Sequence, residues 1–195
     1  EAQKNFSDAL AVYKKVGDVQ NQAAELYHLG QVGYETNQYP EAMKNYGEAL
    51  TLYIKRNDRP GLASVYNSLG KLHLQQHDVH QAETYFQKSL TIARELGFPT
   101  HISTPAEGLY KMYRQKGEVK KALEMHELFV LMRDSVNNEA ARKKVLKAQY
   151  RYEFEMKASA DSILADGEKK VLHAQLSEEK TQRYGLIGGL VLITI

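Results

Sequence analysis

A period of 40 residues is the feature of this sequence that most constrains its fold. A small residue, an aromatic residue four positions later and a second small residue three positions after that recur in the same order, most weakly in the last copy. These segments begin at Ala2, Ala42, Ala82 and Ala122. The pairs Leu29-Gly30 and Leu69-Gly70 are also 40 residues apart. Two independent sets of positions with one period indicate an internal structural repeat.

Each repeat is predicted to be a pair of antiparallel helices. Residues three and four positions apart lie on one face of a helix, and the small residues among them allow a second helix to approach closely. The Leu-Gly pair belongs to the preceding helix, where glycine again permits close contact. Turn-forming residues separate the two helices at Asn37-Gln38, His77-Asp78 and Gly117-Glu118. The sequence therefore predicts an all-α solenoid of helical hairpins.

These positions resemble the tetratricopeptide repeat (TPR) over residues 1 to about 134. The resemblance implies roughly three and a half repeats. They comprise a half repeat at 1–16 and repeats at 23–57, 62–97 and 103–134. The period exceeds the common 34-residue form by about six residues, which we assign to longer second helices that end near Asn57 and Gly97.

The two ends of the predicted array differ from its middle. In the fourth repeat Tyr110, His126 and Phe129 replace the usual small or aromatic residues, as expected where an array ends and another element packs on it. Residues 1–16 supply only the second helix of a repeat. We therefore expect the native chain to continue upstream.

Residues 135–183 lose the period, lack proline and are rich in Lys, Glu, Ala and Leu, which predicts one or two long charged helices. A possible coiled-coil seam recurs at three- and four-residue steps, interrupted by Ser159 and Gly167. Its apolar members are Val145, Ala148, Tyr152, Met156, Ile163, Val171 and Ala174. Alternating polarity at 148–156 is typical of a strand, but the strong helix formers on both sides favour helix.

Residues 184–195 end the chain in the uncharged run GLIGGLVLITI. The run is shorter than the ~20 residues that span a bilayer, so we expect the truncated start of a transmembrane helix. Arg183 and Tyr184 suit a membrane interface. The alternative is a buried C-terminal helix or strand.

This order of segments resembles membrane-bound bacterial signalling proteins of the Bacteroidetes type. The resemblance implies a sensory or scaffolding region, as in two-component systems, with a kinase, cyclase, phosphatase or DNA-binding output domain after residue 195. It also implies a periplasmic repeat domain, whereas Lys180 and Arg183 favour the cytoplasmic side. The alternative is a soluble TPR adaptor whose C-terminal helix caps the array.

Composition and motifs limit the other function classes. The net charge of +2 is small and the charges are interleaved, which argues against nucleic acid as a partner. No cysteine, phosphate-binding loop or HExxH motif is present, so we assign no catalytic residue and no cofactor. His73, His77 and His80 approach a metal-ligand spacing. Because His73 takes a packing position and His77 a turn position, we assign no metal site.

The resemblance implies a peptide-binding groove on the concave face, which is lined by the first helix of each repeat. The positions that carry over are Tyr27, Gln31, Tyr34, Asn67, Lys71, Leu74, Glu107, Lys111 and Arg114. Their tyrosine, amide and cationic groups suit an extended protein or peptide ligand. Lys71, Lys111 and Arg114 indicate an acidic ligand, although Glu107 stands where chaperone-binding members need a cation. The alternative is that these are ordinary solvated helix faces.

Overall fold

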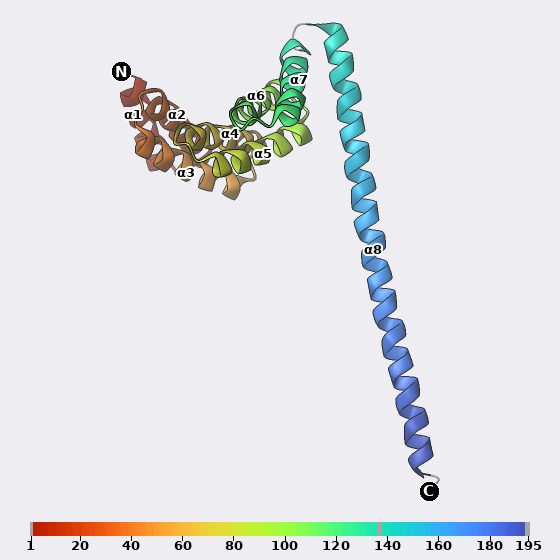
Figure 1. The fold of residues 1–195 in the computed structure, drawn as a ribbon. Coiled ribbons are helices and arrows are strands. Elements are labelled where there is room, and N and C mark those ends of the chain that lie inside the picture. Colours follow the sequence, from red (N-terminus) through yellow and green to blue (C-terminus); the bar gives the residue numbers. More distant parts are fainter. Residues whose placement is uncertain (1, 136–137, 194–195) are drawn as a thin grey trace. The chain divides into compact units, whose positions relative to one another are not determined.

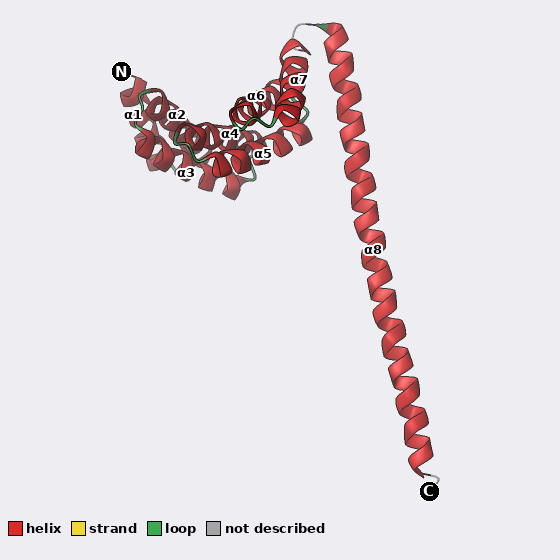
Figure 2. Cartoon of the chain, in the orientation of Figure 1, coloured by secondary structure: helices red, strands yellow, loops and turns green. Residues whose placement is uncertain are grey.

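The computed structural model describes residues 2–135 and 138–193 of the 195-residue chain, except for the side chains of 139–141, 179 and 181–193. All regular secondary structure in this part of the chain is α-helical (Figure 1, Figure 2). The predicted all-α class is confirmed for these residues. The chain divides into two compact units, Glu1–Leu146 and Lys147–Ile195, which we describe separately.

The first unit is a stack of antiparallel helices. Its helices are α1 (Ala2–Val16), α2 (Val19–Glu35), α3 (Tyr39–Arg56), α4 (Arg59–Gln75), α5 (Val79–Leu96), α6 (Pro99–Gln115) and α7 (Val119–Ser135), followed by the first residues of α8 (Glu139–Ile193). First helices have 17 residues and second helices 17 or 18. The assignment of the extra length to the second helices was therefore wrong, because both helices of each pair share it.

The turns between these helices recur at intervals of 20 residues. Each contains one residue with positive φ, between 53° and 74°. These residues are Gly17, Asn37, Asn57, His77, Gly97 and Gly117. Glycine adopts this conformation without steric cost, and Asn and His tolerate it better than most residues. The predicted turns are confirmed, and half of the sequence period is visible as a structural period.

Aspartate side chains fix the start of three helices. Asp18, Asp58 and Asp78 each accept a hydrogen bond from the backbone N–H of the third residue onward, at 3.1, 2.9 and 3.1 Å. Such N-caps satisfy an otherwise unpaired N–H and typically contribute about 1 kcal/mol. At the corresponding position before α6, Phe98 makes no side-chain cap, and Pro99 starts the helix instead.

Glycines and aromatic rings lock neighbouring helices together in the core. Phe86 of α5 is fully buried, and its ring contacts the backbone of α4 at Gly70 and of α6 at Gly108. A Cβ atom at Gly70 would lie 2.6 Å from Cδ1 of Phe86. Tyr46 packs against Gly30 in the same way one repeat earlier. The predicted role of the Leu-Gly pair, which is to allow close contact, is confirmed.

The start of α8 completes the core of the first unit. Val145 is only 7% exposed and packs in the same cluster as Ala122 and Met132 of α7. The Nε atom of Arg142 donates a hydrogen bond to the carbonyl oxygen of Ser135 at 3.2 Å. Val145, predicted as the first residue of a coiled-coil seam, therefore belongs to the core of the array.

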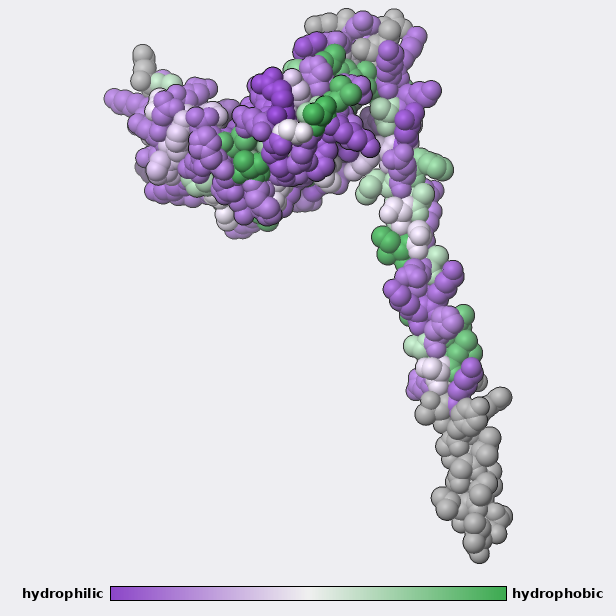
Figure 3. Space-filling view, in the orientation of Figure 1, coloured by the Kyte–Doolittle hydropathy of each residue, from purple (hydrophilic) through white to green (hydrophobic). Residues whose placement is uncertain are grey.

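The second unit consists of the remainder of α8, which is helical at 148–156 and continues to Ile193, beyond the predicted limit of 183. Many of its large apolar side chains are exposed, and hydrophobic patches alternate with hydrophilic ones along its visible surface (Figure 3). They include Tyr150, Phe154, Met156, Ile163, Leu164, Val171, Leu172 and Leu176.

The predicted membrane segment, 184–195, lies outside the residues whose side chains are described. Within the described part of the chain, we find no helix that is both long enough and apolar enough to cross a membrane. The start of a transmembrane helix at 184–195 therefore stays a prediction.

Candidate functional site

The nine predicted groove residues all lie on the first helices of the three hairpins. These helices contact one another in series, α2 with α4 and α4 with α6, and form the inner side of the curved array (Figure 1). Side chains from different repeats can therefore meet on one surface, although they are 40 or more residues apart in the sequence.

Four of the nine residues meet in one hollow of about 360 Å³ between α4 and α6. Lys71 and Leu74 come from α4, and Lys111 and Arg114 from α6. The other lining residues are Gln75, His77 and Gln115. We call this the cationic hollow. It brings three positive side chains to one place, as the resemblance implied.

The three cations of the cationic hollow differ in their own contacts. Nζ of Lys111 lies 2.6 Å from Oε1 of Glu107 one turn earlier. The guanidinium of Arg114 lies 5.6 Å from the ring centre of Tyr110, in a cation–π contact. Lys71 forms no ion pair with any residue that the structure describes. It can therefore meet an anion without first breaking an ion pair.

Tyr34 of α2 extends this surface toward the N-terminal side. Burial raises the pKa of its phenol above the ordinary value of 10.0, as does Tyr39, and the charge of Lys111 partly offsets the rise. The Tyr34 and Tyr39 rings lie 6.0 Å apart. A hydroxyl of α2 is thus within electrostatic reach of the cationic hollow.

The remaining predicted residues make internal contacts. The hydroxyl of Tyr27 accepts hydrogen bonds from Nε2 of Gln31 and Oγ of Ser68, both at 3.3 Å. Asn67 is only 7% exposed, and its buried Oδ1 has no hydrogen-bond partner among the described residues. Asn67 is thus less accessible than a groove-lining residue needs to be.

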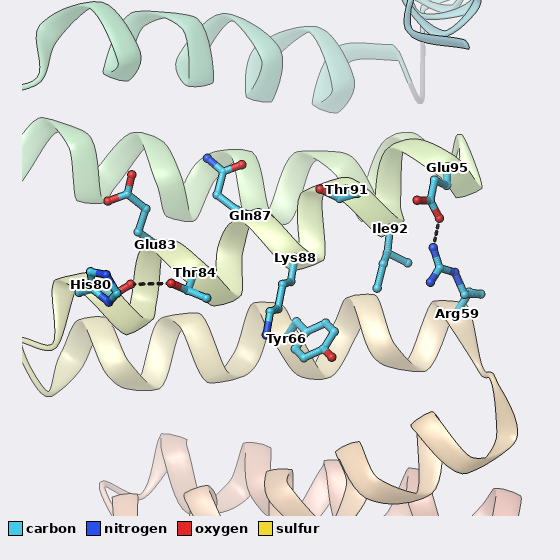
Figure 4. A pocket seen from close by; sticks show the side chains of 10 residues that line it. All are labelled: Arg59, Tyr66, His80, Glu83, Thr84, Gln87, Lys88, Thr91, Ile92 and Glu95. Carbon is cyan, nitrogen blue, oxygen red and sulfur yellow. Dashed lines mark hydrogen bonds and ion pairs between the residues drawn. The ribbon is translucent and has the colours of Figure 1, made fainter. Parts of the chain in front are cut away.

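A second, larger hollow of about 850 Å³ lies between α4 and α5 (Figure 4). Its acidic side chains already have partners. Glu95 forms an ion pair with Arg59, and Glu83 accepts hydrogen bonds from the hydroxyl of Tyr113 at 2.9 Å and from Nζ of Lys116 at 3.1 Å. Paired charges on this surface indicate that they stabilise the packing of the repeats.

The sequence analysis did not identify this second hollow. At its centre Nζ of Lys88 lies 5.6 Å from the ring centre of Tyr66, which stacks on Tyr85. The preceding repeat has Leu26 and Glu48 where this one has Tyr66 and Lys88. Departure from the repeat pattern was the available signal, but it gives no indication of a contact between these two side chains.

The histidines near the α4–α5 turn have structural roles. The ring of His73 stacks on Tyr85 at 5.2 Å, and its Nδ1 lies 3.3 Å from Oδ2 of Asp78. His77 is the turn residue with φ of 61°. The packing and turn positions predicted for these two histidines are confirmed. Within the described residues, no three metal-binding side chains come together.

Comparisons with known proteins support the repeat. Residues 61–128 match the family model of the tetratricopeptide repeat. The crystal structure of BtubC (BKLC) from P. vanneervenii is similar, with a TM-score of 0.62 and 23% sequence identity. That match covers 70% of this chain and 57% of BtubC, so the chain corresponds to little more than half of that protein. The comparison with curated proteins gives no match.

These findings identify tetratricopeptide repeats in the chain, on a helical fold shared with BtubC. Such domains generally bind protein or peptide partners and are generally non-catalytic. The array is therefore an interaction domain.

Proposed function

We propose that the array binds an extended segment of a partner protein along the inner surface of α2, α4 and α6, with an acidic group of that segment in the cationic hollow. The observation that carries this proposal is the convergence of Lys71, Lys111 and Arg114 from two repeats. Charge-assisted hydrogen bonds to carboxylates are stronger than neutral ones. Lys71 supplies the first contact because it has no ion pair within the described chain.

Glu107 tunes this site. Its carboxylate holds Lys111 at 2.6 Å and competes with the ligand for the same cation. An incoming carboxylate therefore gains less from Lys111 than from Lys71. This arrangement favours moderate affinity and a requirement for an acidic group at one position of the ligand.

The test uses a library of fluorescein-labelled octapeptides, with each position scanned through all residue types, and fluorescence anisotropy on the full chain. We expect enrichment of Asp or Glu at one position and loss of that preference in the double variant K71A/R114A. The matched control is Lys88→Ala, which removes an exposed lysine from the second hollow.

Two results would contradict the proposal. One is a library without acidic enrichment. The other is equal loss of binding in the Lys88→Ala control, which would show that any reduction in positive charge weakens peptide association and that the cationic hollow has no special role.

We further propose that the array is the sensory or scaffolding region of a membrane-anchored signal-transduction protein, located in the periplasm, and that α8 pairs two copies of the chain. The support is the order of segments in the sequence and the exposed apolar side chains of α8. Ligand binding changes helix packing only if the ligand has different affinities for two packings. In this proposal, α8 carries that change toward the membrane.

Self-association is tested by light scattering on residues 1–183 and 1–146 over a concentration series. The proposal expects a dimer for the longer fragment and a monomer for the shorter one, which contains the compact first unit. Monomers in both cases would remove the pairing function from α8.

The alternative function, an adaptor whose C-terminal helix caps the array, is favoured by one observation. Val145 of α8 is buried in the core of the repeats. This alternative expects the full chain to remain soluble without detergent, both with and without residues 184–195. Aggregation that disappears when 184–195 are removed would favour the membrane-anchored protein.

A further inference from the structure

We propose that two copies of the chain pair in parallel and in register along α8. This inference rests on the proposed self-association and specifies the contact face and the orientation. The contact face, which we call the apolar stripe, consists of Tyr152, Met156, Ile163, Gly167, Val171 and Ala174.

Exposure makes a second helix necessary for these side chains. Ile163 is 70% exposed, Val171 58% and Met156 52%, although they lie on one face of a regular helix. A Cβ atom at Gly167 would meet no atom within 4 Å. The glycine thus leaves open space on the same face, where a second backbone can approach closely.

The spacing of the stripe identifies the kind of pairing. Residues 152, 156, 159, 163, 167, 171 and 174 are on average about 3.7 residues apart. That value matches an 11-residue repeat, which gives a nearly straight or slightly right-handed pair, and differs from the 3.5 of left-handed coiled coils. Ser159, which interrupts the apolar pattern, is small enough to remain within such a contact.

Charged residues on the two flanks of the stripe determine the orientation. At 3.6 residues per turn, one flank is predominantly acidic and the other is mixed with an excess of cations. The first flank contains Glu153, Asp161, Glu168 and Glu178 with one cation, Lys157. The second contains Arg151, Lys169, Lys180 and His173 with Glu155 and Asp166, of which Asp166 already pairs with Lys170 at 2.8 Å.

Orientation decides which flanks meet. In a parallel pair, each flank of one helix faces the opposite flank of its partner, whereas in an antiparallel pair each flank faces its own copy. An antiparallel pair would therefore place the acidic flank against itself. The parallel pair places it against the more basic flank, so charge complementarity favours the parallel orientation.

Cysteine cross-linking tests the orientation directly, because the chain contains no cysteine. Disulfides form only when the two Cα atoms are about 4.4–6.8 Å apart. Ala148→Cys and Ala174→Cys are introduced singly into full-length chains that carry tags of different size. Ala165→Cys, on the opposite side of α8, is the matched control. Oxidised samples are analysed by non-reducing electrophoresis.

The expected result is efficient cross-linking of Ala148→Cys with itself and of Ala174→Cys with itself, with no product between the two variants and little product from Ala165→Cys. A disulfide between Ala148→Cys and Ala174→Cys would show an antiparallel pair and overturn the inference while leaving self-association intact. Equal cross-linking at Ala165→Cys would show that the stripe is not the contact face.

Absence of cross-links together with a monomeric mass by light scattering would overturn both the inference and the proposed self-association. A dimeric mass without any of these cross-links would place the dimer contact elsewhere and overturn the inference alone.

Discussion

The repeat array and α8 use apolar residues in opposite ways. In the array, Phe86, Tyr46 and Leu72 are almost completely buried against neighbouring helices of the same chain. In α8, Phe154 and Ile163 are 74% and 70% exposed. The difference teaches that the first unit completes its own core, whereas the apolar surface of the second unit needs a partner that the described chain does not supply.

The same contrast applies to glycine. Gly70 and Gly108 of the array are positions where a Cβ atom would collide with the ring of Phe86, so the absence of a side chain is required by packing. Gly167 of α8 faces open space. One residue type thus marks a close contact in one region and a gap in the other, and the sequence alone does not distinguish the two cases.

The largest effect is expected from truncation of the central ring of the array. Phe86→Ala removes a fully buried ring that bridges α4 and α6, and we expect a loss of about 3–5 kcal/mol in the free energy of unfolding. Phe154→Ala in α8 removes an equally large ring and should change the urea midpoint of the array by less than about 0.5 kcal/mol. Similar losses for both variants would break the comparison.

A smaller effect, with opposite sign in the two regions, is expected for glycine replacements. Gly70→Ala forces a Cβ to within 2.6 Å of Phe86 and should destabilise the array by about 2 kcal/mol. Gly167→Ala meets no obstacle and should stabilise α8 by up to about 1 kcal/mol through helix propensity. Thermal unfolding followed by circular dichroism measures both. If Gly167→Ala destabilises a dimer, the glycine is a contact point between helices.

The period, the turns and the glycine–aromatic contacts could be predicted from the sequence because they depend on residues at fixed local spacing. Asn37, His77 and Gly117 are turn residues in any helical hairpin of this length. Burial of Asn67 could not be predicted, since it depends on how α4 is rotated against its neighbours. The contact of Lys88 with Tyr66 depends on rotamers, about which a repeat pattern contains no information.

In the candidate site, the sequence identified the right helices but only part of the right surface. The resemblance placed nine residues on one face, and the structure brings Lys71, Leu74, Lys111 and Arg114 together. Tyr27 and Asn67 face inward instead, because a helix in a stack is covered on both sides and a one-position rotation decides which residues stay open. The resemblance gives the position in the repeat and not this rotation.

An effect on the order of 1 kcal/mol is expected from a buried phenol of the array at high pH. Burial raises the pKa of Tyr53 from 10.0 to about 12. This contribution to stability is complete below pH 10 and is lost as the pH rises toward 12. Tyr53→Phe should therefore lose less stability than the wild type between pH 10 and 12, measured by urea unfolding. Tyr150→Phe in α8, where the ring is 62% exposed, is the control and should behave like the wild type.

The smallest effects concern surface ion pairs, and here the two regions should differ least. Nζ of Lys116 lies 3.1 Å from Glu83 and 2.6 Å from Glu118, so it joins α5 to the turn before α7. We expect Lys116→Ala to cost about 1 kcal/mol, and Asp166→Asn, which breaks the single pair with Lys170, to cost about 0.3 kcal/mol.

Acid titration separates these two variants further. Burial raises the pKa of Glu83, but hydrogen bonds from Lys116 and Tyr113 outweigh that effect and leave the pKa below 4.5. Its contribution is present above pH 4.5 and is lost as the pH falls through the lowered pKa. Lys116→Ala should therefore lose less stability on acidification than the wild type, whereas Asp166→Asn should follow the wild-type curve of the array. If the wild-type and Lys116→Ala curves were parallel, the ion pairs would contribute as little in the array as in α8.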